Sequence, residues 1–166
     1  LQLALAFYAI AFLIGIYIIV QTSWWLAVVG IVSMAIGYFY TGGPFPIAYT
    51  PFGEVVSGFV MGMLLVLISY FIQTGEVTTD AILLSVPSMF LVANIMLANN
   101  IRDIVQDTKG GRKTMAILIG RENAVRVYAT LFALSYIWVI ALVLSQHVTP
   151  WALIVLLTIP KPIKAV

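Results

Sequence analysis

Residues 94–126 read NIMLANNIRDIVQDTKGGRKTMAILIGRENAVR and hold nine of the fourteen charged residues of the chain. The remainder is overwhelmingly apolar: the 166 residues are 63% hydrophobic and 8% charged, and their mean hydropathy is +1.11. A soluble domain is about one quarter charged, and burying each charge in mid-bilayer would cost roughly 2.5–3.5 kcal/mol. The stretch therefore predicts a water-facing segment at the surface of an all-α, polytopic transmembrane helix bundle.

Composition excludes several kinds of site. The chain has no cysteine, which excludes disulfides, thiolate metal sites and cysteine nucleophiles, and its single histidine, His147, cannot form a histidine pair for zinc. We expect His147 to be incidental. The net charge of +2 comes from a few cations in one sector, so no nucleic-acid partner is expected. Leu1 is not an initiator methionine and no signal peptide follows it, so we expect a chain truncated at both ends.

The apolar runs predict six spans within a single transmembrane domain, residues 1–166, because about 20 apolar residues suffice to cross a bilayer. Prolines and glycines block a continuous helix in residues 40–54, YTGGPFPIAYTPFGE, which we expect to form a re-entrant or surface loop. The predicted spans are residues 1–20, 23–40, 54–73, 81–101, 124–145 and a shorter 150–159 that stops at Pro160.

Individual residues mark the ends and packing faces of these spans. Ser23 and Asp80 are predicted to cap helices, and Pro87 is predicted to kink the fourth span. Gly58 and Gly62 lie four residues apart in the third span. That spacing of small residues indicates close packing against another helix of the bundle.

The lysines and arginines predict the orientation of the bundle. If six spans alternate from residue 1, the loops at residues 40–53, 101–123 and 160–166 share one side of the membrane. All eight Lys and Arg lie on that side or within a turn of it. By the positive-inside rule this side is cytoplasmic. We therefore expect a multi-pass membrane protein whose charged loops face the cytoplasm.

Asp103 and Asp107 are four residues apart, which places both carboxylates on one helix face, with Asn99 one turn earlier. Two carboxylates aimed at one point repel each other unless a cation lies between them. Oxygen ligands of this kind suit Mg²⁺ together with phosphate oxygens. Residues 109–113, KGGRK, then combine flexible backbone with three cations that can bind phosphate. A Mg²⁺-diphosphate site is the resulting hypothesis.

The alternative interpretation is a solvated face. Cytoplasmic loops of membrane proteins are commonly charged, and an acidic pair at this spacing is a weak signal by itself. The amides of Asn99 and Asn100 at the end of a span favour a site, because a merely solvated loop does not need them. On the alternative interpretation the chain is a transporter or lipid-binding bundle subunit without enzymatic activity.

Residues 99–121, NNIRDIVQDTKGGRKTMAILIGR, resemble the second aspartate-rich motif of the UbiA superfamily of intramembrane aromatic prenyltransferases. The shared form is NNxRDxxxD, then a glycine, a basic pair and threonine, then Leu-x-Gly. It is similar to the branch that prenylates 1,4-dihydroxy-2-naphthoate in menaquinone synthesis. The loop at residues 40–54 also resembles that branch, and the similarity covers nearly the whole chain.

The resemblance implies a nine-helix bundle in the plasma membrane of a bacterium. Two aspartate-rich motifs would face each other at a cytoplasm-side cavity, hold the Mg²⁺-diphosphate of a polyprenyl diphosphate and help it to ionise. The allylic cation would attack the ring of 1,4-dihydroxy-2-naphthoate, whose carboxylate is lost to give demethylmenaquinone. The chemistry is physically consistent, since cations stabilise the leaving diphosphate and a dry apolar cavity protects a cation that water would quench.

The resemblance also implies roles for individual residues. Asp103 and Asp107 match the catalytic, metal-binding aspartates. On a helix Arg102 points about 100° away from Asp103, so a diphosphate contact and a structural ion pair are both open. Asn94 matches an asparagine of the family but lies about 180° around a straight helix from Asp103. The candidate diphosphate ligands are Arg102, Asn99, Lys109, Arg112 and Lys113, and the candidate acceptor or cavity residues are Asn94, Tyr40, Tyr49 and Glu54.

Some of these residues have plainer explanations, and two departures from the family pattern matter. Glu54 would also suit the positive end of a helix, and Tyr40 and Tyr49 would suit the membrane interface. The first motif, NDxxDxxxD, is absent and normally lies upstream of residue 1, so we expect the chain to be inactive alone. Tyr40 is followed four residues later by Pro44 instead of lysine, which argues against the hydroxybenzoate branch.

The motif also bears on two further enzyme classes. Other aromatic acceptors of the superfamily, such as those of the protohaem and homogentisate branches, stay open. A CDP-alcohol phosphotransferase is disfavoured, because its Asp-Gly-x-x-Ala-Arg signature is missing.

Overall fold

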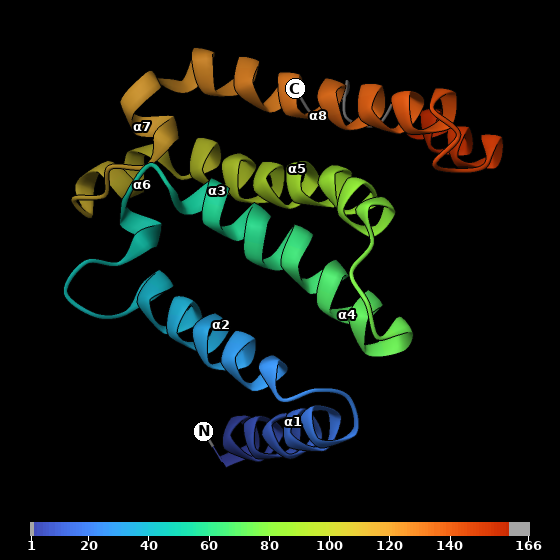
Figure 1. Ribbon diagram of the computed structural model, residues 1–166. Helices are drawn as coiled ribbons and strands as arrows, with labels where there is room; N and C mark the ends of the chain where they lie inside the picture. Colours follow the sequence, from blue (N-terminus) through green and yellow to red (C-terminus); the bar gives the residue numbers. More distant parts are fainter. Residues whose placement is uncertain (1, 160–166) are drawn as a thin grey trace.

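The apolar runs of the chain form helices that lie side by side, joined by short turns (Figure 1). A computed structural model describes residues 2–159, and within that range it contains helices and no strand. The elements in order are α1 Gln2–Gln21, α2 Trp25–Thr41, η1 Ile47–Tyr49, α3 Gly53–Ser57, η2 Gly58–Leu64, α4 Leu65–Thr74, α5 Thr79–Arg102, α6 Ile104–Lys109, α7 Met115–Ile119, α8 Arg121–Leu144 and η3 Pro150–Thr158.

Helix α5 is central in the arrangement, with α8 packed on one side and the α3–η2–α4 helix on the other (Figure 1). A buried cluster fills the corner where α5, α7 and α8 meet. The cluster adjoins the end of α5 that carries the charged stretch, so it gives that stretch a packed base. Its members are Leu97, Ile101, Ala116 and Ala124.

Three helices are long and apolar enough to cross a membrane: Gly53–Thr74, Thr79–Arg102 and Arg121–Leu144. They confirm the third, fourth and fifth predicted spans. The first two predicted spans correspond to α1 and α2, which are apolar helices of 20 and 17 residues. The chain is therefore an all-helical, multi-pass membrane protein.

The predicted sixth span differs in the structure. Residues Pro150–Thr158 form a 3₁₀ helix of nine residues that packs against α8. At about 2.0 Å per residue a helix of this kind covers only about 18 Å, whereas the hydrocarbon core is about 30 Å thick. The segment as far as Thr158 is thus too short to span. The predicted stop at Pro160 lies outside the described residues.

Gly58 and Gly62 confirm the prediction of close helix packing. A Cβ atom at Gly58 would lie 2.7 Å from the Met89 carbonyl oxygen, and one at Gly62 would lie 2.6 Å from Met89 Cα. Both glycines lie in η2, which is a π-helix over Gly58–Leu64. A π-helix this long is rare, and it was not predicted from the sequence. The two glycines let the backbones of η2 and α5 touch.

Pro87 lies inside α5 and changes its hydrogen bonding. Because proline has no N–H, the carbonyl of Leu83 loses its partner within the helix. The indole Nε1 of Trp138 in α8 donates to that oxygen at 2.9 Å. A packing contact between α5 and α8 thus satisfies the group that Pro87 leaves free. The kink at Pro87 stays a prediction.

Two predicted helix caps are wrong. The N-cap of α5 is Thr78, whose backbone is extended and whose hydroxyl accepts from Ala81 N at 3.2 Å. Asp80 is already inside the first turn, and its carboxylate lies 2.7 Å from Nδ1 of His147, so His147 joins the turn after α8 to the start of α5. Ser23 does not cap α2: the residue before the helix is Trp24, which is itself helical and makes no side-chain cap.

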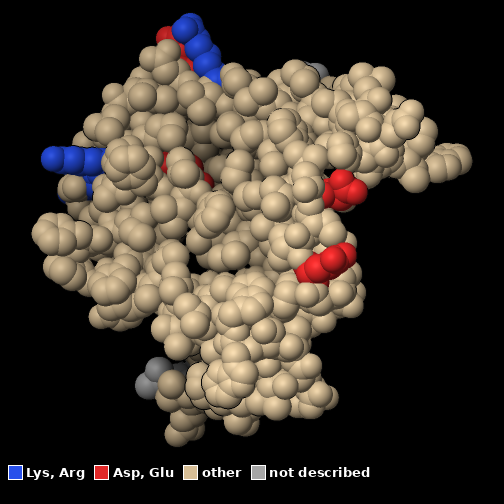
Figure 2. Space-filling model, in the orientation of Figure 1, with Lys and Arg blue, Asp and Glu red and all other residues tan. Residues whose placement is uncertain are grey.

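The basic side chains lie at one end of the bundle. Every described Lys and Arg lies between the last residue of α5 and the first turns of α8. Figure 2 shows the blue side chains on the side where α6 and the start of α8 lie, and acidic side chains at the opposite edge. The described residues thus agree with the one-sided distribution of lysine and arginine read from the sequence.

We expect Gly62→Ala to lower the free energy of unfolding by about 1–3 kcal/mol, because the new methyl group would overlap the Met89 backbone, which cannot rotate away. The measurement is thermal unfolding of the full-length protein in detergent micelles. Gly30→Ala is the matched control, since a Cβ there meets nothing within 4 Å. Equal stability of the two variants would contradict the packing role.

Trp138→Phe should destabilise the protein by about 0.6–1.7 kcal/mol, the usual range for a hydrogen bond between membrane helices. The reason is that the Leu83 carbonyl loses its donor. In a Pro87→Ala background the restored N–H supplies that carbonyl, so the same substitution should cost less. A double-mutant cycle of unfolding free energies measures the difference, and a coupling energy of zero would refute this account.

Candidate functional site

The charged stretch folds at the end of α5 into what we call the aspartate segment, residues 99–114. Helix α5 ends at Arg102, and Asp103 leaves helical geometry with φ −97° and ψ 8°. Helix α6 follows, and the chain then turns back at Gly111, where φ is +74°. Only glycine adopts such a backbone readily. The segment therefore returns toward the bundle before α7 begins.

Asp103 is held by its neighbour. Nε and NH2 of Arg102 donate to the two carboxylate oxygens of Asp103 at 2.8 Å each. This hydrogen-bonded guanidinium holds the pKa of Asp103 below its usual range. The prediction that Arg102 points away from Asp103 is therefore wrong, because the helix ends between the two residues. Of the two open roles, the structure contains the ion pair.

Asp107 occupies a different environment. It is buried, and its Oδ1 lies 3.2 Å from NH1 of Arg112. The guanidinium of Arg112 also lies over the ring of Tyr49, 4.7 Å from its centroid, in a cation–π contact. Arg112 thus joins the second aspartate to the loop that precedes α3.

The two aspartates are one turn apart, but their carboxylates have separate partners. The backbone N–H of Asp107 donates to the carbonyl of Asp103 at 2.9 Å, and that of Asp103 donates to Asn99 at 2.9 Å. Asn99 is exposed on the preceding turn. The side chain of Asp103 is 41% exposed and that of Asp107 only 11%. Among residues 2–159 no group of three or more His, Cys, Asp or Glu could hold a metal ion.

A second loop lies over this segment. We call residues 42–52 the proline–glycine loop; it contains η1 and the predicted residue Tyr49. The carbonyl of Tyr49 accepts a hydrogen bond from the backbone N–H of Lys113 at 2.8 Å. The side chains of Lys109 and Lys113 are exposed and form no ion pair within the described part of the chain. The two loops are thus joined by a backbone hydrogen bond and by the Arg112–Tyr49 contact.

Glu54 is the most deeply buried charged residue of this region, at 2% exposure. Its Oε1 accepts a hydrogen bond from Nδ2 of Asn100 at 2.8 Å, whereas Oε2 has no partner among residues 2–159. Tyr40 donates to the carbonyl of the adjacent Gly53 at 3.3 Å. Sequence reasoning did not assign Asn100 to the site. Its signal was the second amide of the Asn99-Asn100 pair.

Asn94 lies away from the aspartates, as the helical angle predicted. It is buried, and its Nδ2 donates to the carbonyl of Tyr128 in α8 at 3.1 Å. Its Oδ1 has no partner in the described range. Asn94 therefore links α5 to α8 in the structure.

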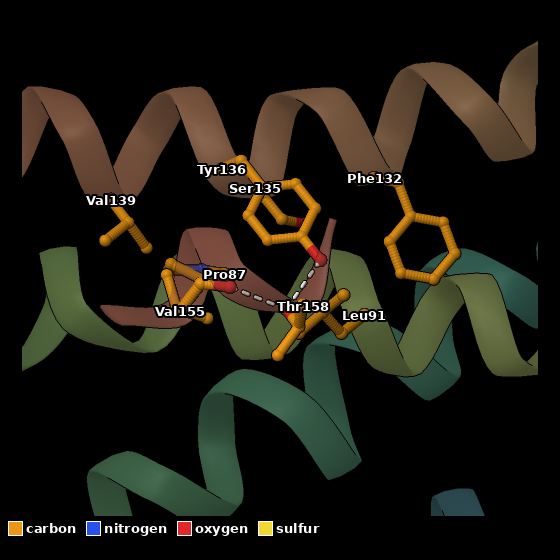
Figure 3. A pocket seen from close by; sticks show the side chains of 8 residues that line it. All are labelled: Pro87, Leu91, Phe132, Ser135, Tyr136, Val139, Val155 and Thr158. Carbon is orange, nitrogen blue, oxygen red and sulfur yellow. Dashed lines mark hydrogen bonds between the residues drawn. The ribbon is translucent and has the colours of Figure 1, made fainter. Parts of the chain in front are cut away.

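One apolar cavity of about 300 Å³ lies between α5, α8 and η3 (Figure 3). The Tyr136 hydroxyl lies 3.0 Å from Oγ1 of Thr158, and Figure 3 draws this hydrogen bond as a dashed line. The cavity wall includes Leu91, which is eleven residues before the end of α5, or about 16 Å along the helix. None of the predicted site residues lines it. The lining residues are Pro87, Leu91, Phe132, Ser135, Tyr136, Val139, Val155 and Thr158.

Comparison with known proteins finds relatives along nearly the whole chain. The model of the UbiA prenyltransferase family matches residues 1–164. A 1,4-dihydroxy-2-naphthoate octaprenyltransferase of Bacillus subtilis (strain 168) is 58% identical over 166 residues, which are 100% of this chain and 53% of that protein. A protein of the same name from Mycobacterium tuberculosis is 28% identical over 165 residues, 99% of this chain and 56% of that protein.

A human relative matches a shorter part of the chain. UbiA prenyltransferase domain-containing protein 1 is 31% identical over 135 residues, 81% of this chain and 39% of that protein. The chain thus spans about half the length of the first two relatives. No solved structure matches it.

Replacing Arg102 should raise the pKa of the Asp103 carboxyl. In Arg102→Gln we expect the pKa of Asp103 to rise toward its ordinary value, because the hydrogen-bonded guanidinium that lowers it is gone. In the folded protein the pKa of Asp103 is lowered, so above that pKa its carboxylate is charged and paired with Arg102. The ion pair is lost when the pH falls through the folded-state pKa and the carboxyl takes up a proton. A ¹³C NMR titration of labelled aspartate carboxyls measures the change. Arg126→Gln is the control, because Arg126 pairs with Glu122; an unchanged Asp103 pKa in Arg102→Gln would contradict the assignment.

Proposed function

Because the chain belongs to the UbiA prenyltransferase family, we propose that it carries part of an enzyme that transfers a polyprenyl group from polyprenyl diphosphate to 1,4-dihydroxy-2-naphthoate. The carboxylate of the acceptor is lost, and the immediate product is the quinol form of demethylmenaquinone, because the transfer itself oxidises nothing. The proposal draws on the name of the Bacillus subtilis relative, which is 58% identical over this whole chain. It also draws on the residues of the aspartate segment.

One observation carries the proposal: two carboxylates one turn apart are each held by an arginine of the same segment. Arg102 binds Asp103 with two hydrogen bonds, and Arg112 lies 3.2 Å from Asp107. Guanidinium groups bind phosphate in the same bidentate manner as carboxylate. On this proposal the segment supplies both carboxylates and guanidinium groups to a site for a metal-bound diphosphate.

The donor set is compatible with Mg²⁺. The ion typically takes one or two carboxylates and fills its other positions with water and substrate phosphate oxygens. Asp103 and Asp107 would hold it on this side of the site. Two protein carboxylates suffice for such a role, so the lack of a third acidic ligand within residues 2–159 is no obstacle. When bound, the ion would neutralise charge on the diphosphate and so favour its departure.

The chain's own residues would then act on the diphosphate directly. Arg102 and Arg112 can exchange a carboxylate for a phosphate partner without leaving the segment. The exposed Lys109 and Lys113 add positive charge that attracts the polyanion. The proline–glycine loop, joined to the segment at Tyr49, covers one side of Arg112 and limits the access of water.

We place the site at the cytoplasmic face of a bacterial plasma membrane. The described lysines and arginines all lie at the end of the bundle that carries the aspartate segment, and Glu76 and Asp80 lie at the other. Loops rich in lysine and arginine stay in the cytoplasm. An accessibility assay on single cysteines, introduced at Lys109 and at Glu76, would test this sidedness.

We expect Asp103→Asn and Asp107→Asn, each made in the full-length enzyme, to lower kcat by on the order of 10²-fold or more, because each removes a charge that stabilises the departing diphosphate. The assay follows prenylated product from 1,4-dihydroxy-2-naphthoate and polyprenyl diphosphate while Mg²⁺ is varied. The half-saturating Mg²⁺ concentration should rise in both variants.

The matched control is Glu122→Gln, which also removes a carboxylate from an arginine pair but on an exposed surface. It should leave the rate unchanged. Normal turnover by both aspartate variants would refute the proposal and favour a non-enzymatic, anion-binding role for the segment. Product formed only from a different aromatic acceptor would reassign the substrate.

A further inference from the structure

Glu54 Oε2 is a buried carboxylate oxygen without a hydrogen bond inside the described range. Glu54 is only 2% exposed, and its other oxygen accepts a hydrogen bond from Asn100 at 2.8 Å. Buried polar atoms are nearly always paired, and an unpaired carboxylate oxygen is among the most costly to bury. This oxygen needs a hydrogen-bond donor that residues 2–159 do not supply, and a bound ligand can supply one.

The position of Glu54 ties it to the diphosphate site. Its partner Asn100 lies in the last turn of α5, three residues before Asp103. Asn100 thus joins the Glu54 carboxylate to the last turn of α5, where the aspartate segment begins. A molecule that contacts Glu54 Oε2 would lie beside the end of the aspartate segment.

The groups around Glu54 suit an aromatic hydroxyl. The Tyr40 hydroxyl donates to the carbonyl of Gly53, next to Glu54 in the sequence, and its oxygen lone pairs can still accept a hydrogen bond. Ser57 lies one turn further along and is also buried. A few convergent polar groups in an otherwise apolar setting are typical of sites that orient a small aromatic ligand.

We propose that Glu54 Oε2 accepts the hydrogen bond of a ring hydroxyl of the aromatic acceptor and takes its proton during the transfer. Glu54 is then a catalytic residue, and Asn100 is a positioning residue that fixes the carboxylate. The inference rests on the proposed function. It adds the base and the acceptor subsite, which are distinct from the groups that bind diphosphate.

The reaction balances with Glu54 as a temporary proton carrier. The hydroxyl proton passes to Oε2, and the electron pair of the O–H bond enters the ring. The ring carbon that bears the carboxylate forms a bond to the allylic carbon as the C–O bond to diphosphate breaks, and diphosphate leaves with that pair. The acceptor carboxylate leaves as carbon dioxide, its bonding pair returns to the ring, and Glu54 returns its proton to the ring oxygen. No external oxidant, reductant or base is needed.

The test is Glu54→Gln in the full-length enzyme. Glutamine keeps the size of the side chain and can still accept a hydrogen bond from Asn100, but it cannot take a proton. We expect kcat/KM for 1,4-dihydroxy-2-naphthoate to fall by on the order of 10²–10³-fold, as for loss of a general base. The KM for polyprenyl diphosphate should stay within about twofold of wild type, which also shows that the variant is folded. Glu54→Asp, which keeps the carboxylate, should recover part of the activity.

A second measurement distinguishes a direct contact between Glu54 and the acceptor from a purely structural role of Glu54. In two acceptor analogues one ring hydroxyl or the other is replaced by methoxy. The wild-type enzyme should reject one of them by on the order of 10⁴-fold, because a site built to bind a hydroxyl is left unpaired without it. In Glu54→Gln that discrimination should shrink to about tenfold. Asn100→Ala should raise the KM for the acceptor while it keeps the discrimination.

Glu76→Gln is the control, since Glu76 is exposed in the turn between α4 and α5. If Glu54→Gln still rejected the methoxy analogue as strongly as the wild-type enzyme does, the inference would be overturned. The missing partner of Oε2 would then belong to another part of the protein. Equal losses for donor and acceptor would also overturn it, because Glu54 would then be a structural tie. A wild-type enzyme that does not prenylate the naphthoate at all would refute the proposed function itself, before any variant is compared.

Discussion

A charge inside a bilayer needs water or a hydrogen-bonded partner, and the arrangement of this chain follows from that requirement. The described cations lie at one end of the bundle, where the chain leaves the apolar helices. Asp103 and Asp107 each lie beside an arginine. Glu54 is buried with an amide as its partner. The same requirement that keeps charge out of the helices therefore concentrates it in one small region.

What could be predicted from the sequence is what depends on local spacing. The apolar runs identified the three long spans, and the four-residue spacing of Gly58 and Gly62 identified a close helix contact. Both follow from the geometry of a single helix. The proline–glycine loop was likewise evident, because its composition cannot sustain a helix.

What could not be predicted depends on groups that meet from distant parts of the chain. No local pattern shows that Asn100 will meet Glu54, or that Asp80 will meet His147. Arg102 was misplaced for a related reason: helical geometry was assumed to continue through Asp103, where the helix in fact ends. The nine residues after Thr149 resemble the start of a span in composition, but nine residues cover only about 18 Å even with the longer rise of a 3₁₀ helix.

The backbone hydrogen bond from Lys113 to Tyr49 has a consequence for biosynthesis. Tyr49 leaves the ribosome long before Lys113, with two long helices made in between, so this bond cannot form until both helices have been made. Those helices must be brought together before the two loops can engage. Maturation of the site is therefore a late event that depends on translation having passed Lys113.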